Sequence, residues 1–181
     1  MRPTPLLLAV LIAVPAFAQN AKQAATPKSR TGASAVADIR THWKMLSGFI
    51  VESAMDVPED KYDYKPTPAV RSFGEMFAHV AGAQSMFCAM ALGEKPPAED
   101  AVSAKTKAGL IDALKASNAN CERAYAQSDA DAGRNVDVFG EQHTRLYALM
   151  MNATHDGEHY GNLITYLRMN GMVPPSSKPS K

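Results

Sequence analysis

The chain has 181 residues, with 19 Lys and Arg, 18 Asp and Glu, five His and two Cys. Because 46% of the residues are hydrophobic and the charges are interspersed, intrinsic disorder is excluded for most of the chain. The balanced charge, without a basic run or a glycine-rich phosphate loop, argues against a nucleic-acid or nucleotide-binding protein. The length suits one domain with a single core.

The N-terminus has the pattern of a secretory signal peptide. Arg2 supplies the positive charge, residues 6–14 form an apolar run, and the tripeptide Ala-Phe-Ala at 16–18 is a small-residue cleavage site. Cleavage after Ala18 removes one arginine and leaves 18 basic and 18 acidic residues. The apolar run is too short to cross a bilayer, and nothing later is longer. We therefore expect a periplasmic or secreted protein without a membrane span.

Residues 19–33 are small, polar and aperiodic, which predicts a disordered leader. A helix is predicted over about 34–54, and residues 55–71, which contain three prolines, are expected to form a loop. The apolar residues of the helix recur at helical spacing: Ile39, Trp43, Leu46, Ile50 and Val51.

The next helix begins at a capping box, with Ser72 as the N-cap and Glu75 three residues on. It is expected to end before Gly93, a residue suited to the position after a helix. A long polar connection follows over 94–105. A third helix is predicted over about 106–127, with Leu110, Ile111, Leu114 and Tyr125 on its apolar face.

Residues 128–140 are predicted to be a loop, and the longest helix is expected over about 141–170. Because strand-like alternation is not apparent, the sequence predicts an all-α fold, a four-helix bundle over 34–177. Residues 178–181 are expected to form a frayed tail.

The last helix carries His155 and His159, four residues apart. Such residues lie about 40° apart around the axis and about 6 Å along it, so both imidazoles can reach one cation. Imidazole is a common ligand of Zn, Ni, Cu and Fe. The residue after the first histidine is Asp156, where a zincin protease has glutamate, so that class is disfavoured.

A third ligand is expected from His79, which lies among apolar residues of the second helix and is predicted to face the bundle interior. An isolated histidine is more often an ordinary core or surface residue, but three inward histidines in a small bundle favour a metal site. His143 lies about 18 Å along the helix from His155 and cannot share it. His42 likewise has no second histidine at a ligand spacing.

The stretches that include His79 and the histidine pair resemble the DinB-like (damage-inducible, YfiT-type) superfamily of metal-dependent four-helix-bundle proteins. They read Arg-Ser-Phe-Gly-Glu-Met-Phe-Ala-His-Val at 71–80, His-Asp-Gly-Glu-His-Tyr-Gly-Asn-Leu at 155–163 and Tyr-Leu-Arg-Met-Asn-Gly at 166–171. The resemblance covers about residues 36–177 and implies that His79, His155 and His159 bind a divalent metal: Zn, Ni or Fe. Asn162 departs from the family pattern, which often has Gln there.

The resemblance also implies helices that run up, down, down and up, which the long 94–105 connection permits. In that topology the second and third helices run parallel, and Cys88 and Cys121 lie at equal height. In an oxidising compartment we expect them to form a disulfide. The alternative is two buried thiols.

Three neutral ligands leave coordination positions open for water or a small-molecule substrate, which is typical of catalytic sites. Members of the family include thiol-dependent transferases and isomerases, and metal-assisted hydrolysis is the other enzymatic option for an exported chain. Asp156 and Glu158 are interpreted as solvent-facing groups or as neighbours of the ligands. The alternative function is a non-catalytic metal- or ligand-binding bundle of the cell envelope. The sequence leaves a homodimer open.

Overall fold

The computed structural model describes residues 34–179, so the expected signal peptide and the whole expected leader, 19–33, lie outside the described residues. This part of the chain is mostly helical, in agreement with the predicted class. The four long helices are α1 (Ala35–Asp56), α2 (Phe73–Leu92), α3 (Lys107–Ala124) and α5 (Arg145–Met169). The shorter elements are the 3-10 turns Glu59–Lys61 and Pro175–Ser177, the one-turn helix α4 (Asp129–Ala132), and strands β1 (Asn135–Val138) and β2 (Glu141–Thr144).

Each long helix begins at a serine or threonine whose hydroxyl oxygen accepts a hydrogen bond from a backbone N–H three residues on. The caps are Ser34, Ser72, Thr106 and Thr144. At α2 the capping box is complete, because the backbone N–H of Ser72 also donates to the Glu75 carboxylate at 2.8 Å. Gly93 ends α2 in the left-handed conformation, with φ of 72°. These local signals fix where the second helix, which carries His79, begins and ends.

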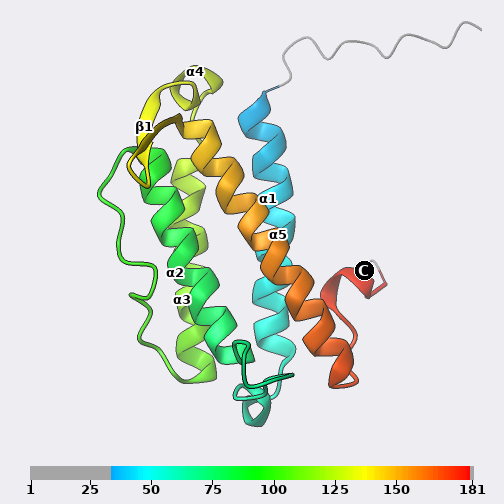
Figure 1. Cartoon of the computed structure of the whole chain (residues 1–181). Coiled ribbons are helices and arrows are strands. Elements are labelled where there is room, and N and C mark those ends of the chain that lie inside the picture. The colour runs from blue at the N-terminus through cyan, green and yellow to red at the C-terminus, as the bar shows by residue number, and fades with distance from the viewer. Residues whose placement is uncertain (1–33, 180–181) are drawn as a thin grey trace, which may run out of the picture. The chain divides into compact units, whose positions relative to one another are not determined.

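Figure 1 shows α1 and α5 running in one direction and α2 and α3 in the other. Helix α2 packs against both α3 and α5, and α1 packs against α5 and α3. The connection between α2 and α3 returns along the outside of α2 (Figure 1). The core forms two clusters along the bundle, one around Trp43 and one around Phe73 and Phe77. Because α2 packs against α5, histidines on the facing sides of these two helices can approach each other.

The prediction of a loop over 128–140 is wrong. That segment contains α4 and, with residues 141–144, an antiparallel hairpin in which Asn135 pairs with Thr144 and Val138 with Glu141. Val136 and Val138 are buried between exposed neighbours, so the period-two pattern is present but only four residues long. The last helix consequently begins at Arg145 rather than 141, and the third ends at Ala124 rather than 127.

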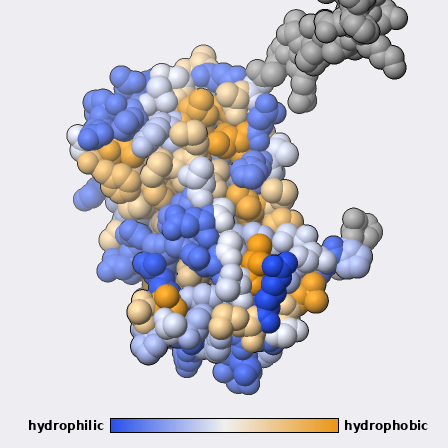
Figure 2. Space-filling view, turned by 45° about the vertical axis from the view of Figure 1, so that its right-hand side comes forward, coloured by the Kyte–Doolittle hydropathy of each residue, from blue (hydrophilic) through white to orange (hydrophobic). Residues whose placement is uncertain are grey.

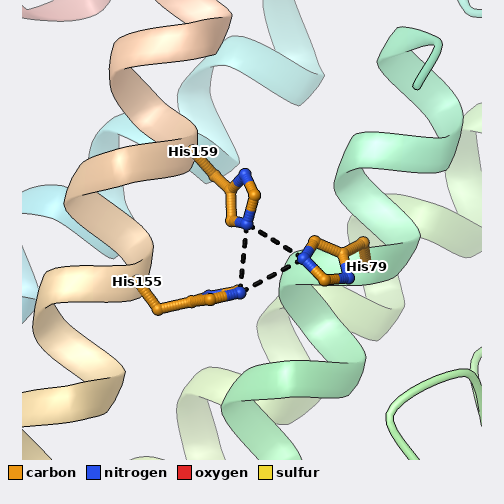
Figure 3. Close-up of side chains that lie close together, drawn as sticks. All are labelled: His79, His155 and His159. Carbon is orange, nitrogen blue, oxygen red and sulfur yellow. Dashed lines mark hydrogen bonds between the residues drawn. The ribbon is translucent and has the colours of Figure 1, made fainter. Parts of the chain in front are cut away.

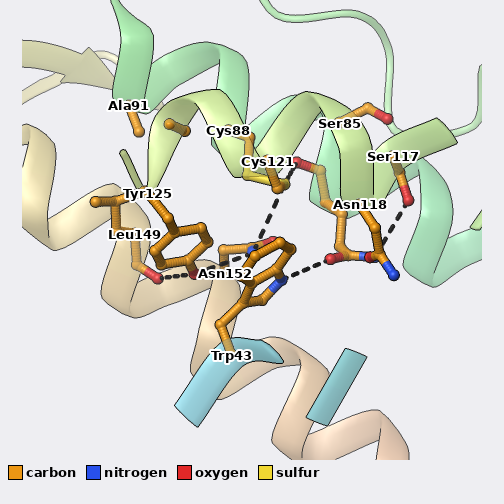
Figure 4. Close-up of a disulfide and its surroundings, with 12 residues drawn as sticks. Trp43, Ser85, Cys88, Ala91, Ser117, Asn118, Cys121, Tyr125, Leu149 and Asn152 are labelled. Atoms are coloured by element: carbon orange, nitrogen blue, oxygen red, sulfur yellow. Dashed lines mark hydrogen bonds between the residues drawn. A yellow bond between two sulfur atoms is a disulfide. The ribbon is translucent and has the colours of Figure 1, made fainter. Parts of the chain in front are cut away.

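The disulfide between Cys88 of α2 and Cys121 of α3 is present, as predicted (Figure 4). Both cysteines are buried. Beside it, Trp43 of α1 stacks on Tyr125, with 4.4 Å between the ring centroids, and its Nε1–H donates to Gln84 Oε1 at 2.9 Å. The bridge therefore lies in the core and joins the two parallel helices.

No helix among residues 34–179 is long and apolar enough to cross a membrane. On the face drawn in Figure 2, apolar areas alternate with hydrophilic ones. At the C-terminal end, Lys178, in the segment expected to fray, forms ion pairs with Glu52 and Asp56 of α1 at 2.7 and 2.6 Å.

Candidate metal centre

The three histidines singled out in the sequence come together between α2 and α5. Figure 3 shows their Nε2 atoms converging on one point. The Nε2–Nε2 distances are 2.9 Å for His79–His159, 3.2 Å for His79–His155 and 3.0 Å for His155–His159. His155 and His159 point from one face of α5 because they are four residues apart, and His79 reaches them from the facing side of α2.

All three imidazoles are neutral at neutral pH. Burial lowers the pKa of His155 to about 3 and that of His159 to about 4, with further lowering from the neighbouring histidines and from Arg71. Burial and the Arg71 charge also lower the pKa of His79, against an opposing effect of the Glu99 carboxylate. Neutral imidazole is the form that binds a metal.

Three such nitrogens so close together cannot all be satisfied by hydrogen bonds to one another. A neutral Nε2 carries either a hydrogen or a lone pair. At least two of the three atoms therefore carry the same one, and those two cannot form a hydrogen bond with each other. A cation facing three lone pairs removes the conflict. Because the sides of the triangle are nearly equal, a point about 1 Å out of its plane lies about 2.0–2.1 Å from each nitrogen, which is the usual Zn–N distance. The donor set fits a divalent transition metal.

His79 differs from the other two histidines in what its second nitrogen contacts. Its Nδ1 lies 2.8 Å from Glu99 Oε1, a residue of the connection between α2 and α3. The Nδ1 atoms of His155 and His159 are buried without a hydrogen-bond partner among the described residues. Because His79 is neutral, its contact with Glu99 is an N–H donated to a carboxylate rather than an ion pair.

Two clefts reach the triad. A cleft of about 880 Å³ includes His79 and Glu99 in its lining, and a second of about 700 Å³ lies between α2 and α5 beside His159 and Glu158. Arg71 lines both. Its side chain forms no hydrogen bond or ion pair with residues 34–179, so a positive charge without a partner borders the site.

Other polar residues considered from the sequence lie elsewhere. Asp156 is fully buried in the core, and neither of its carboxylate oxygens has a partner among the described residues. The interpretation of Asp156 as a solvent-facing group is therefore wrong. Burial raises the pKa of this carboxyl well above its usual range. Glu158 is exposed, as expected. His143 lies in β2 and stacks on Tyr147, outside the triad, and His42 is not part of it.

Two residues at the site were not found from the sequence. Glu99 lies in an aperiodic polar connection, and Arg71 is the last residue of a proline-containing loop, so neither belongs to a periodic pattern. Gly82 lies inside the predicted second helix, but a glycine there does not by itself indicate a contact with another backbone, because the helix glycines at 48, 157 and 161 meet none.

Comparisons with known proteins identify the family and the fold. The sequence profile described as the DinB superfamily matches residues 38–163. A comparison with curated proteins returned no match. Among solved structures, a DinB-like protein from Bacillus cereus ATCC 10987 superposes with a TM-score of 0.67 at 15% identity, over 77% of this chain and 95% of that one.

Two further solved structures share the fold. A DinB-like protein from Bacillus subtilis gives a TM-score of 0.63 at 23% identity, over 79% of this chain and 99% of that one. A protein assigned to the DinB family from Exiguobacterium sibiricum 255-15 gives 0.62 at 19% identity, over 77% and 93%. These identities establish similarity of fold alone. Because the family profile covers more than two thirds of the sequence, the chain belongs to the DinB superfamily.

Proposed function

We propose that this chain is an exported protein that binds one divalent transition metal through His79, His155 and His159 and uses it in hydrolysis or group transfer on a small molecule. The observation that carries the proposal is the triangle of Nε2 atoms at 2.9–3.2 Å. Without a cation, these three atoms cannot all be satisfied by hydrogen bonds to one another. Zn, Ni and Fe all accept imidazole ligands.

Three neutral protein ligands leave coordination positions open, as in catalytic rather than structural sites. A divalent metal bound there would polarise a carbonyl or phosphoryl oxygen and lower the pKa of a bound water. Arg71, which borders both clefts, is placed to receive an anionic group of the substrate. Glu158 lines the same cleft as His159, and its carboxylate forms no ion pair within residues 34–179. We assign Glu158 as the proton acceptor on this side.

Two observations support export. The first 18 residues have the three parts of a signal peptide. The Cys88–Cys121 disulfide is of a kind that persists in oxidising compartments and is rare in a reducing cytosol. N-terminal sequencing of the protein from a periplasmic or culture fraction tests this part of the proposal. A mature chain that begins at Gln19 supports it, and a chain in the cytosol that begins at Met1 contradicts it.

The second candidate is a metal- or ligand-binding bundle of the cell envelope that has no turnover. The open coordination positions and the two clefts favour it equally, because both provide a binding site without naming a reaction. Metal-loaded protein assayed against ester, amide, phosphoester and thiol-transfer substrates separates the two functions. The enzyme proposal predicts turnover that is lost in His159→Ala and kept in His143→Ala. Binding without turnover in any assay supports the second candidate.

A further inference from the structure

The connection between α2 and α3 touches α2 at Gly82. A Cβ built on Gly82 would lie 1.8 Å from the carbonyl oxygen of Glu99 and 2.9 Å from its carbonyl carbon. Real Cβ atoms do not approach other atoms so closely, so only glycine permits the backbone of Glu99 to lie here. The connection is thus held against α2 at one defined residue.

This contact lies next to the metal centre. Gly82 follows His79 by three residues and therefore lies on the same face of α2, about one turn away. From there the side chain of Glu99 reaches His79, with Oε1 at 2.8 Å from Nδ1. The imidazole of His79 is 13% exposed and the Glu99 side chain 45% exposed, so the carboxylate approaches the ring from the solvent side.

We infer that Glu99 is a positioning residue for the metal centre: its carboxylate accepts the Nδ1–H of His79 and so directs the Nε2 lone pair of His79 toward His155 and His159. The inference rests on the proposed metal site. The connection between α2 and α3 has no secondary structure beyond a turn, yet the inference gives it a role in the site. Gly82 is the residue that permits its position.

Such a group favours metal binding by His79. Neutral imidazole carries its hydrogen on one nitrogen only, and a ligand must keep that hydrogen away from the metal-facing atom. A carboxylate on the other nitrogen holds the required tautomer and the ring orientation, and makes the ligand more basic. Because His155 and His159 have no acceptor on Nδ1 among the described residues, His79 is the ligand that is fixed before the metal arrives.

The test uses the mature chain, four single variants and the Glu99→Ala/Gly82→Ala double variant. Glu99→Ala removes the carboxylate, and Glu99→Gln keeps an oxygen that accepts the hydrogen. Gly82→Ala leaves Glu99 intact but displaces its backbone. Asp100→Ala is the matched control, because this neighbouring carboxylate is exposed and forms no side-chain hydrogen bond with residues 34–179. Zn²⁺ affinity is measured by competition with a chromogenic chelator, and the His79 tautomer by ¹⁵N NMR of the metal-free protein.

We expect Glu99→Ala and Gly82→Ala each to weaken Zn²⁺ binding about 10- to 100-fold. Their double variant should be no weaker than either, because both remove the same contact. Glu99→Gln should recover part of the affinity, and Asp100→Ala should match the wild type. In the wild type the hydrogen of His79 should reside on Nδ1, and in Glu99→Ala it should be distributed over both nitrogens.

Two results overturn the inference. One is Glu99→Ala protein with Zn²⁺ affinity within about twofold of the wild type. The other is a wild-type His79 whose hydrogen resides on Nε2 in the metal-free protein. A wild type that binds no Zn²⁺, Ni²⁺ or Fe²⁺ defeats the proposed function instead, and the NMR comparison of wild type with Glu99→Ala then decides the role of Glu99 separately.

Discussion

Reduction of the Cys88–Cys121 disulfide should destabilise the bundle by a predictable amount. The bridge joins residues 33 apart, and the chain-entropy relation for a loop of that size gives about 3.7 kcal/mol at 25 °C. The thiols formed remain buried and behave as small apolar groups, so little packing is lost. For a domain of this size the change corresponds to a Tm lower by about 7–15 °C.

The assay monitors thermal unfolding by circular dichroism in the presence of a chelator. It compares oxidised protein with protein that has been reduced while unfolded and then refolded in reductant. Cys88→Ala/Cys121→Ala is the control, because its Tm should not respond to reductant. The reasoning is refuted if oxidised and reduced wild type unfold at the same temperature, because the bridge then does not reduce the conformational entropy of the unfolded chain.

Three further predictions concern charge. Asp156→Asn should raise the free energy of unfolding at pH 7, because burial without a partner disfavours the charged carboxylate of the folded state and so raises the pKa of Asp156. The gain should vanish below about pH 4 in urea titrations, where the carboxyl of the unfolded chain is protonated as well. In that variant, without metal, the lowered pKa values of His155 and His159 mean that the unfolded chain binds more protons between about pH 4 and 6.5. Stability should therefore fall as pH is lowered through this range, and a rise would contradict the assignment. Arg71→Met should raise the pKa of all three histidines in an NMR titration, whereas Arg168→Met, at the far end of α5, should leave them unchanged.

The helix that carries His79 was predictable because its ends depend on local chemistry. Ser72 and Glu75 form the capping box that they indicate in the sequence, and Gly93 adopts the left-handed conformation that ends the helix. The observed bounds, Phe73–Leu92, therefore agree with the prediction. Such signals involve residues a few positions apart, which a single sequence displays directly.

The hairpin was missed because its signals are short and unusual. Each strand has four residues, too few for alternation to be distinguished from an irregular segment. The turn residues are Phe139 and Gly140, with φ of 56° and 87°. Phenylalanine rarely adopts positive φ, whereas Asn or Asp before Gly is the usual sign of such a turn. Phe139 packs edge-on against Phe87, with 5.9 Å between the ring centroids, and this tertiary contact accompanies the strained turn.

The site was predictable to the extent that its residues share helices. His155 and His159 are four residues apart, and His79 lies on an apolar stretch, so spacing and family resemblance together identified the triad. Glu99 could not be found in this way. It is 20 residues from His79 in a connection without periodicity, and its position depends on a backbone contact with Gly82 that only the folded chain shows.

The central claim, that the triad binds a metal, is tested most directly by the metal content of the mature protein purified without a chelator or a metal-affinity tag. Elemental analysis should compare the wild type with His79→Ala, His155→Ala and the control His143→Ala. The account predicts about one transition-metal equivalent in the wild type and in His143→Ala, lost from the other two with helicity unchanged. A wild type without metal even after reconstitution, or variants at 79 and 155 that keep it, would contradict the account.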